Sequence, residues 1–252
     1  MQLGLKDKVV VVTGGTKGIG RAIVEAFLQE SAIVHFCSRT DKDVQAATAD
    51  LIYAGRAFGA VVDVSQEDQV KKWISKIEEE AGRIDVVVSN VSSLTMSNTI
   101  TGWTSAFNVD MLGTFSLVEA ALPSLEKNKG NIITISSVSG RDVDFTAPSP
   151  YGTFKAALIH YTAQLAHTLA PKGVRANTVS PGNIYIEDGV WGGIEKQNPT
   201  LFKSQLEKNP FGRMGTAEEV ANTVVFLASS KASFVSGTNM VVDGSLCSGV
   251  QF

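Results

Sequence analysis

The run "VVVVTGGTKGIGRAI", residues 9–23, decides the fold. Its first five residues form a continuous apolar and β-branched run, which is typical of a strand buried on both faces of a sheet. Glycines at positions 14, 18 and 20 follow at once, and a helical pattern of apolar residues begins behind them. A strand, a glycine-rich turn and a helix in this order predict the first β–α unit of a parallel sheet.

The same alternation of short β-branched runs and longer helical patterns continues along all 252 residues. Because crossovers between parallel strands are right-handed, it predicts a doubly wound parallel sheet with helices on both faces. We expect one α/β domain over residues 1–252, a Rossmann fold with a seven-stranded sheet. The expected strands cover residues 9–13, 32–37, 57–63, 84–90, 130–137, 174–182 and 239–244. The expected helices cover residues 20–30, 41–54, 67–82, 99–125 and 149–166, with two more between the last two strands.

The amino-acid composition disfavours several classes of binding partner. Its 22 basic and 25 acidic residues leave a formal charge of −3 without any basic block, which disfavours nucleic acid and anionic membranes. Two distant cysteines and three histidines match neither a metal-ligand nor a redox spacing, so we expect no metal. We find no signal peptide and no apolar run of membrane-spanning length, and we therefore expect a reduced, soluble, cytoplasmic protein.

The glycine turn is suited to a dinucleotide. Glycine lets the backbone turn tightly and lets a pyrophosphate approach main-chain N–H groups, while the helix N-terminus adds partial positive charge toward the phosphates. A glycine triplet alone is a weak signal, but between a strand and a helix it is much stronger. The residues of the turn that we expect to contact a cofactor are Gly14, Thr16, Lys17, Gly18, Ile19 and Gly20.

The end of the second strand indicates which dinucleotide is bound. An acidic side chain there would accept hydrogen bonds from the ribose 2′-hydroxyl of NAD. This strand instead ends "FCSRT", with Ser38 and Arg39, and Lys17 adds a second cation from the glycine turn. Two cations without a carboxylate favour a 2′-phosphate, so the sequence predicts NADP(H) as the cofactor.

The stretch "SPYGTFKAALIHYTAQLA", residues 149–166, places Tyr151 and Lys155 one helical turn apart. A tyrosine with its ordinary pKa near 10 is a poor acid or base at neutral pH. An ammonium one turn away favours the phenolate, and it can also bond the ribose hydroxyls of a nicotinamide nucleotide. The pair indicates a catalytic role only if other parts of the chain supply further residues of a site.

The chain resembles the short-chain dehydrogenases/reductases nearly from end to end. The marks are the Gly-x-x-x-Gly-x-Gly turn, "SNVSS", "ISSVSG", "YGTFK", "SPG" and the tail "GRMGTAEEVANTVVFLASSKASFVSGTNMVVDG". The resemblance implies Tyr151 as general acid/base, Lys155 as its partner, and Ser137 as a donor to the carbonyl oxygen. Ser136 and Ser139 are nearby candidates for that donor. The resemblance also implies cofactor contacts from Asp63, Val64, Asn90, Val91, Ser92, Tyr151, Lys155, Pro181, Gly182 and Ile184.

Three positions depart from the family pattern. Asp110 stands where the family has an asparagine that holds a water near the lysine, and an ionised aspartate can accept a hydrogen bond from that water but cannot donate one. Ser92 replaces a glycine beside the cofactor, and Ile186 replaces a threonine that contacts the nicotinamide. These changes leave open a nucleotide-binding regulator with little turnover. The intact tyrosine and lysine favour an active oxidoreductase, with Asp110 as a further site residue.

Residues 183–215 form the one irregular region, which we interpret as a lid over the substrate. Apolar residues there and in the loop after the fifth strand predict a pocket for a ketone that is reduced to a secondary alcohol. Acidic residues near the rim, Asp142, Asp144, Glu187 and Asp188, disfavour an anionic carrier, although a 3-oxoacyl thioester stays open as an alternative. The family resemblance also implies a homotetramer.

Overall fold

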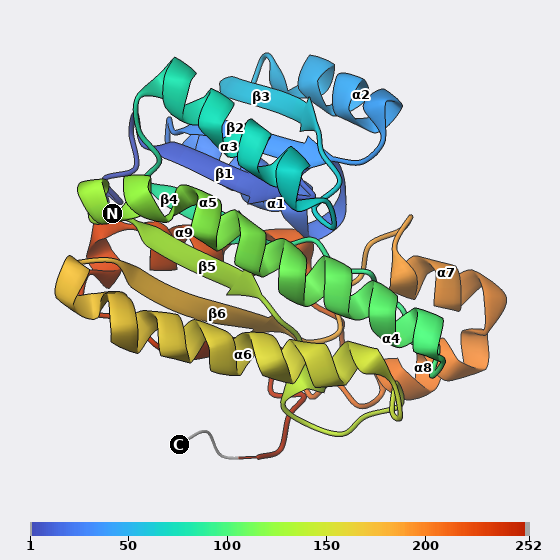
Figure 1. Cartoon of the computed structure of the whole chain (residues 1–252). Coiled ribbons are helices and arrows are strands. Elements are labelled where there is room, and N and C mark those ends of the chain that lie inside the picture. Colours follow the sequence, from blue (N-terminus) through green and yellow to red (C-terminus); the bar gives the residue numbers. More distant parts are fainter. Residues whose placement is uncertain (1, 250–252) are drawn as a thin grey trace.

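The computed structural model, which describes residues 2–249, is built around one seven-stranded sheet (Figure 1). Neighbouring strands all pair in parallel, in the order β3-β2-β1-β4-β5-β6-β7. The order reverses between β1 and β4, and such a switch point is where ligands bind in doubly wound sheets. The predicted fold class is confirmed. The strands are β1 (Val9–Thr13), β2 (Ile33–Ser38), β3 (Arg56–Val61), β4 (Val86–Ser89), β5 (Asn131–Ile135), β6 (Arg175–Pro181) and β7 (Asn239–Val242).

Helices cover both faces of the sheet. Successive side chains of a strand point to opposite faces, so Val10 and Val12 pack into one core while Val9 and Val11 pack into the other. The first core is closed by α1 (Gly18–Gln29), α2 (Asp41–Leu51) and α9 (Ala217–Ala228). The second is closed by α3 (Glu67–Ala81), α5 (Gly113–Asn128) and α6 (Pro150–Leu169). None of the helices within residues 2–249 combines the length and the apolar character needed to cross a membrane.

The helix predicted over residues 99–125 consists of three consecutive pieces. It begins as α4 (Ile100–Ala106), continues as a π-helical turn (Phe107–Leu112), and ends as α5. A π turn adds a residue to one turn of a helix, and such turns are frequent at functional sites. In this protein the π turn buries Asp110, which is 2% exposed. The sequence pattern predicts the helix but does not reveal the π turn.

Residues 183–215 contain regular structure that the sequence analysis did not predict. Two short helices, α7 (Val190–Gln197) and α8 (Pro199–Leu206), lie past the carboxyl ends of the strands (Figure 1). The expectation of two helices between the last two strands is therefore wrong, because the described residues hold α7, α8 and α9 there. The Asn198 side chain accepts a hydrogen bond from the Leu201 N–H at 3.1 Å, and Pro199 suits the first helical position. In the sequence, this Asn-Pro pair follows several glycines and therefore resembles a loop, so the start of α8 could not be predicted.

Candidate active site

The predicted site residues gather at the carboxyl edge of the sheet. Gly14 directly follows β1, Asn90 follows β4, Ser137 lies two residues after β5, and Pro181 ends β6. Parallel strands bring these distant segments to a common edge, and β1 and β4 flank the switch point. The geometry therefore places the glycine turn next to the segments that carry the proposed chemistry.

The glycine turn has backbone conformations and spacings that require glycine. Gly18 has φ +61°, and a Cβ at Gly20 would lie 2.0 Å from the carbonyl oxygen of Gly14. The helix α1 begins at Gly18, two residues before the predicted start, and no side chain caps it from Lys17. The first N–H groups of a helix have no partner within the helix, so the amino end of α1 is suited to a phosphate. Thr16 and Ile19 lie within the same turn.

Asn90 joins the ends of two central strands. Its backbone N–H donates to Thr13 Oγ1 at 3.0 Å, and its side-chain amide donates to the Thr13 carbonyl at 3.0 Å. A Cβ at Gly14 would lie 2.9 Å from a methyl group of Val91, so the loop after β4 packs directly on the glycine turn. The Ser92 hydroxyl accepts from the Leu94 N–H at 3.3 Å, which gives the departure from glycine a local partner.

Two cations are available where a 2′-phosphate would lie. Lys17 in the glycine turn and Arg39 after β2 are both exposed, and neither forms an ion pair within residues 2–249. The nearby Arg21 differs, because its guanidinium contacts Glu25 at 2.6 Å and Asp50 at 3.8 Å. Ser38, the last residue of β2, is half-buried beside Arg39. The charges here suit an anion, and the binding of a 2′-phosphate stays a prediction.

Asp63 and Val64 follow β3 at the same edge. The Asp63 carboxylate accepts from the Ser65 N–H at 3.0 Å and from the Ser65 hydroxyl at 2.8 Å. Val64 is buried, and a Cβ at Gly113 would lie 3.1 Å from one of its methyl groups. Their adenine contacts stay a prediction.

The two adjacent serines after β5 have different environments. Ser136 Oγ donates to the Lys155 carbonyl at 2.7 Å, so this hydroxyl is used to fix α6. Ser137 Oγ instead donates to Ser139 Oγ at 3.2 Å and accepts from the Ser139 N–H at 3.1 Å. Ser139 Oγ in turn donates to Asp144 Oδ2 at 2.5 Å. From the sequence, Asp144 is expected only at the pocket rim. Its link to Ser137 through Ser139 could not be predicted, because residue spacing gives no signal for it.

Tyr151 and Lys155 lie in the first turns of α6, which starts at Pro150. Tyr151 is partly exposed, whereas Lys155 is 2% exposed. The Lys155 ammonium lies 5.8 Å from the centroid of the Tyr151 ring and donates to the Ile135 carbonyl at 3.0 Å. The end of β5 therefore holds the ammonium close to the tyrosine.

Asp110 contacts the lysine directly. Its Oδ1 lies 3.3 Å from Lys155 Nζ, and both side chains are 3% exposed. Its Oδ2 accepts from the Ser93 N–H at 3.0 Å. From the family resemblance we expect Asp110 to act on the lysine through a water, whereas the structure brings the two side chains into an ion pair. The π turn, which places Asp110 toward α6, was the signal that the sequence lacked.

Residues 183–215 contact both the glycine turn and the loop before α6. A Cβ at Gly18 would lie 3.3 Å from Ile186 Cδ1, so Ile186 contacts the glycine turn. Next to it, Ile184 pairs in a β-bridge with Gly215, and a Cβ at Gly182 would lie 2.7 Å from Asp243 Cβ. Ring contacts continue from the loop before α6 into α7 and α8, with centroid distances of 5.7 Å for Phe145–Trp191 and 6.5 Å for Trp191–Phe202.

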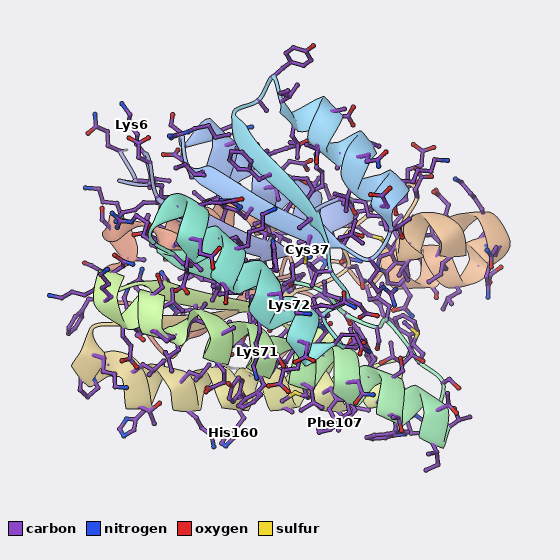
Figure 2. All side chains as sticks on the ribbon, turned by 45° about the horizontal axis from the view of Figure 1, so that its top comes forward. Lys6, Cys37, Lys71, Lys72, Phe107 and His160 are labelled. Atoms are coloured by element: carbon purple, nitrogen blue, oxygen red, sulfur yellow. The ribbon has the colours of Figure 1, made fainter. Side chains whose placement is uncertain are left out.

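Other reactive side chains lie away from this edge. Figure 2 shows Cys37 in the interior, where burial raises the pKa of its thiol to about 12. Burial also lowers the pKa of His35, and His160 lies on the outer face of α6 (Figure 2). Within residues 2–249, no three of the histidine, cysteine and acidic side chains are grouped in a way that could hold a metal ion.

Comparison with known proteins decides the family. Residues 14–246 match a family model described as enoyl-(acyl carrier protein) reductase. Isoepoxydon dehydrogenase patN of Penicillium expansum is 43% identical to this chain over 99% of its length and 98% of the relative's. The chain belongs to the short-chain dehydrogenase/reductase family.

Two further matches of this short-chain dehydrogenase/reductase are named as reductases. The 3-oxoacyl-[acyl-carrier-protein] reductase FabG of Aquifex aeolicus is 32% identical over 98% of this chain and 100% of that protein. The solved structure of L-sorbose reductase from Gluconobacter frateurii, complexed with NADPH and L-sorbose, superimposes with a TM-score of 0.89. That structure is 27% identical and covers 99% of this chain and 100% of its own. The family uses nicotinamide cofactors, and the crowded glycine turn and uncapped α1 fit such a group.

Proposed function

We propose that this protein is an NADPH-dependent cytoplasmic enzyme that reversibly reduces a ketone to a secondary alcohol. The observation that carries the proposal is the buried Lys155 ammonium held beside Tyr151, at the same sheet edge as the glycine turn and Ser137. Burial of a lysine requires partners, and this one has a carbonyl and a carboxylate. The NADPH complex of L-sorbose reductase supports the choice of cofactor.

The cofactor would be held by the segments that follow β1, β2, β3, β4 and β6. Main-chain N–H groups of the turn from Gly14 to Gly20 would bind the pyrophosphate, and Lys17 and Arg39 would bind the 2′-phosphate. Lys155 would bond the nicotinamide ribose. When bound, the cofactor would supply a hydride to the carbonyl carbon.

Three side chains would manage the carbonyl oxygen. Tyr151 would give its proton to that oxygen as negative charge develops, and Ser137 would donate a second hydrogen bond to it. Ser137 can do so because its only acceptor within the described residues, Ser139 Oγ, lies at a long 3.2 Å. The ammonium of Lys155 would stabilise the phenolate that remains on Tyr151. In the reverse direction the phenolate would take the proton from the alcohol.

We propose a neutral, compact ketone as the substrate, with residues 183–215 as its lid. The rings of Phe145, Trp191 and Phe202 form an apolar wall that joins the lid to the loop before α6. The relatives named for isoepoxydon and L-sorbose support a small substrate. A 3-oxoacyl thioester is the second candidate, favoured by the FabG relative. The exposed acids Glu187 and Asp188 oppose it, because they would repel an acidic carrier.

We further propose a homotetramer without nucleic-acid or membrane partners. Apolar side chains are exposed along the α4–α5 helix, with Ile100 at 84%, Phe107 at 44% and Phe115 at 46% (Phe107 is labelled in Figure 2). The strand β7 lies at one edge of the sheet. Exposed apolar patches and free strand edges are typical of subunit interfaces. Light scattering after gel filtration tests this, and a monomer would contradict it.

An activity screen tests the proposed function. NADPH oxidation would be followed with ketoses, cyclic ketones and 3-oxoacyl thioesters, and we expect turnover with a neutral ketone. Tight NADPH binding without turnover on any substrate would favour the regulator instead. For the cofactor, Arg39→Ala should raise the KM for NADPH about 10-fold or more and change the KM for NADH little. The matched control is Lys42→Ala, an exposed cation three residues further along the chain. An equal effect on both cofactors would contradict the 2′-phosphate assignment.

A further inference from the structure

Asp110 uses both of its carboxylate oxygens on hydrogen-bond donors. Oδ1 faces the Lys155 ammonium at 3.3 Å, and Oδ2 faces the Ser93 N–H at 3.0 Å. The residue is 2% exposed, so these contacts are shielded from bulk solvent. Asp110 therefore connects α6 to the segment that follows β4 and borders the glycine turn.

An amide could not make both contacts. A carboxylate offers two acceptor oxygens, whereas an asparagine side chain offers one acceptor and one donor group. With asparagine at position 110, the NH₂ group would face either the Lys155 ammonium or the Ser93 N–H, and each of these is itself a donor. The two donors around Asp110 therefore match a carboxylate. An asparagine, which the family has at this position, would leave one of them without an acceptor.

The carboxylate also offsets the charge of the ammonium. Opposite charges at about 3 Å in a low-dielectric interior attract strongly, and their combined field at a third group is much weaker than that of either alone. The Tyr151 ring lies 5.8 Å from Lys155 Nζ. The ammonium therefore acts on Tyr151 as one half of an ion pair rather than as an isolated cation.

Few other charged side chains face this pair. Of the elements packed on α6, the helix α4, the strand β5 and the 3₁₀ turn Val138–Gly140 contain no ionisable residue. In β6 the charge is Arg175, at the far end of the strand, where it donates to the carbonyls of Leu227, Ser229 and Val235. After the 3₁₀ turn come Arg141, which contacts Asp142, and Asp144, which is bonded to Ser139 and Thr146. On α6 itself, His160, Tyr161 and His167 lie further along the helix, and Lys172, in the 3₁₀ turn Ala170–Lys172 at its far end, pairs with Glu126.

We infer that Asp110 is a positioning residue whose carboxylate fixes the Lys155 ammonium and offsets its charge, so that the ammonium acts on Tyr151 more weakly than an unpaired cation would. The inference rests on the proposed function for its catalytic consequence. Removal of the charge at position 110 would strengthen the effect of the ammonium on the phenol, and the working pH range of the enzyme would move toward acid.

The test compares Asp110→Asn with the wild type in two measurements. The first is the pH dependence of kcat/KM for alcohol oxidation, whose rising limb should move to lower pH by about one unit. The second is the ultraviolet titration of Tyr151 without substrate, obtained as the difference between each protein and its Tyr151→Phe counterpart, which should move in the same direction. A purely structural role for Asp110 would lower activity without moving either curve.

Matched variants make the result specific. Asp68→Asn, on the exposed side of α3, changes the net charge equally and should leave both curves in place. Asp110→Glu keeps the charge and should stay near the wild-type curves. If Asp110→Asn does not fold, Asp110→Ser is measured in its place, because serine also removes the charge.

The outcomes separate this inference from the proposed function. If the phenol titration shifts but no carbonyl substrate is turned over by the wild type, Asp110 keeps the assigned role and the reductase proposal fails. If the wild type is active and neither curve moves in the uncharged variant, the role assigned to Asp110 is wrong and the reductase proposal stands.

Discussion

Two buried aspartates lie at opposite ends of β4. Asp85 immediately precedes the strand and is 4% exposed, whereas Asp110 lies beyond its other end, is 2% exposed, and contacts the segment that follows it. Asp85 pairs with Lys8 and Arg83, whose side chains are 37% and 41% exposed. Asp110 pairs with a lysine as buried as itself. The same residue type thus meets solvent-facing cations at one edge of the sheet and a buried cation at the other.

The partners indicate what each carboxylate does. Asp85 accepts from the Val9 N–H at 2.9 Å, and its carbonyl accepts from the Asn131 N–H at 2.9 Å, so it joins the starts of three strands. Burial alone would raise the pKa of Asp85, but the hydrogen bonds from Arg83, Val9 and Lys8, with the charge of Lys8, outweigh it and lower the pKa. The partners of Asp85 indicate a role in stability, whereas we propose that Asp110 organises the site. Changes at the two edges should then affect different measurements.

The largest effect is expected at the carboxyl edge of the sheet, where the candidate active site lies. Tyr151→Phe should lower kcat/KM about 100-fold or more, because it removes the proposed proton donor, while NADPH affinity and the thermal midpoint change little. Tyr161→Phe, ten residues along the same helix, is the matched control and should keep its activity. Full activity in Tyr151→Phe would remove this residue from the mechanism and end the distinction between the two edges.

A change at Asp85, at the opposite edge of the sheet, should affect stability rather than activity. Asp85→Ala should lower the free energy of unfolding by about 2 kcal/mol, because the Val9 N–H loses a charged acceptor and the exposed cations lose their partner. The kcat/KM of the folded variant should stay near the wild-type value. Urea unfolding and steady-state kinetics on the same preparations check both statements. A variant of normal stability with impaired turnover would place Asp85 in the site instead.

The pH dependence of stability sharpens the same comparison. Because folding lowers the pKa of Asp85, its stabilising contribution is fully present above the pKa of an unfolded aspartate, about 4. The contribution is lost as the pH falls through the lower pKa of the native state. The difference in urea midpoint between wild type and Asp85→Ala should therefore be constant near neutral pH and shrink below about pH 4. A difference that grows toward acid would contradict this sign.

The smallest expected effect concerns the start of α9. This helix end lies next to the site but contributes only to stability. Thr216 and Glu219 form a capping box at the start of α9, directly after the Gly215 bridge to Ile184. Thr216→Ala should lower the free energy of unfolding by about 1 kcal/mol and leave the KM for NADPH unchanged. Thermal unfolding and NADPH kinetics test this. A marked rise in KM would show that the cap also holds the segment at Ile184 in place.

The sequence predicts the fold well because its signals are local and repeated. The valine run of β1, the glycine turn and the helical spacing of Tyr151 and Lys155 each depend on a few neighbouring residues, and the observed elements lie where these patterns predict them. The Lys155–Asp110 pair could not be predicted in this way. It depends on a π turn, whose hydrogen-bond shift leaves no clear periodicity, and on the Ser93 N–H, which any residue except proline would offer. The Ser137–Ser139–Asp144 chain similarly depends on loop geometry.

The π turn constrains how this chain can change in length. Each residue of a regular helix advances the side chains by about 100°, so the extra residue of the turn sets the angular offset between the part of the helix before it and the part after it. Loss of one residue between Ala106 and Gly113 would rotate α5 against α4. Either the carboxylate would leave the lysine, or Leu117 and Leu125 would leave the sheet. Insertions and deletions in this segment should therefore be far less tolerated than point substitutions on its outer surface.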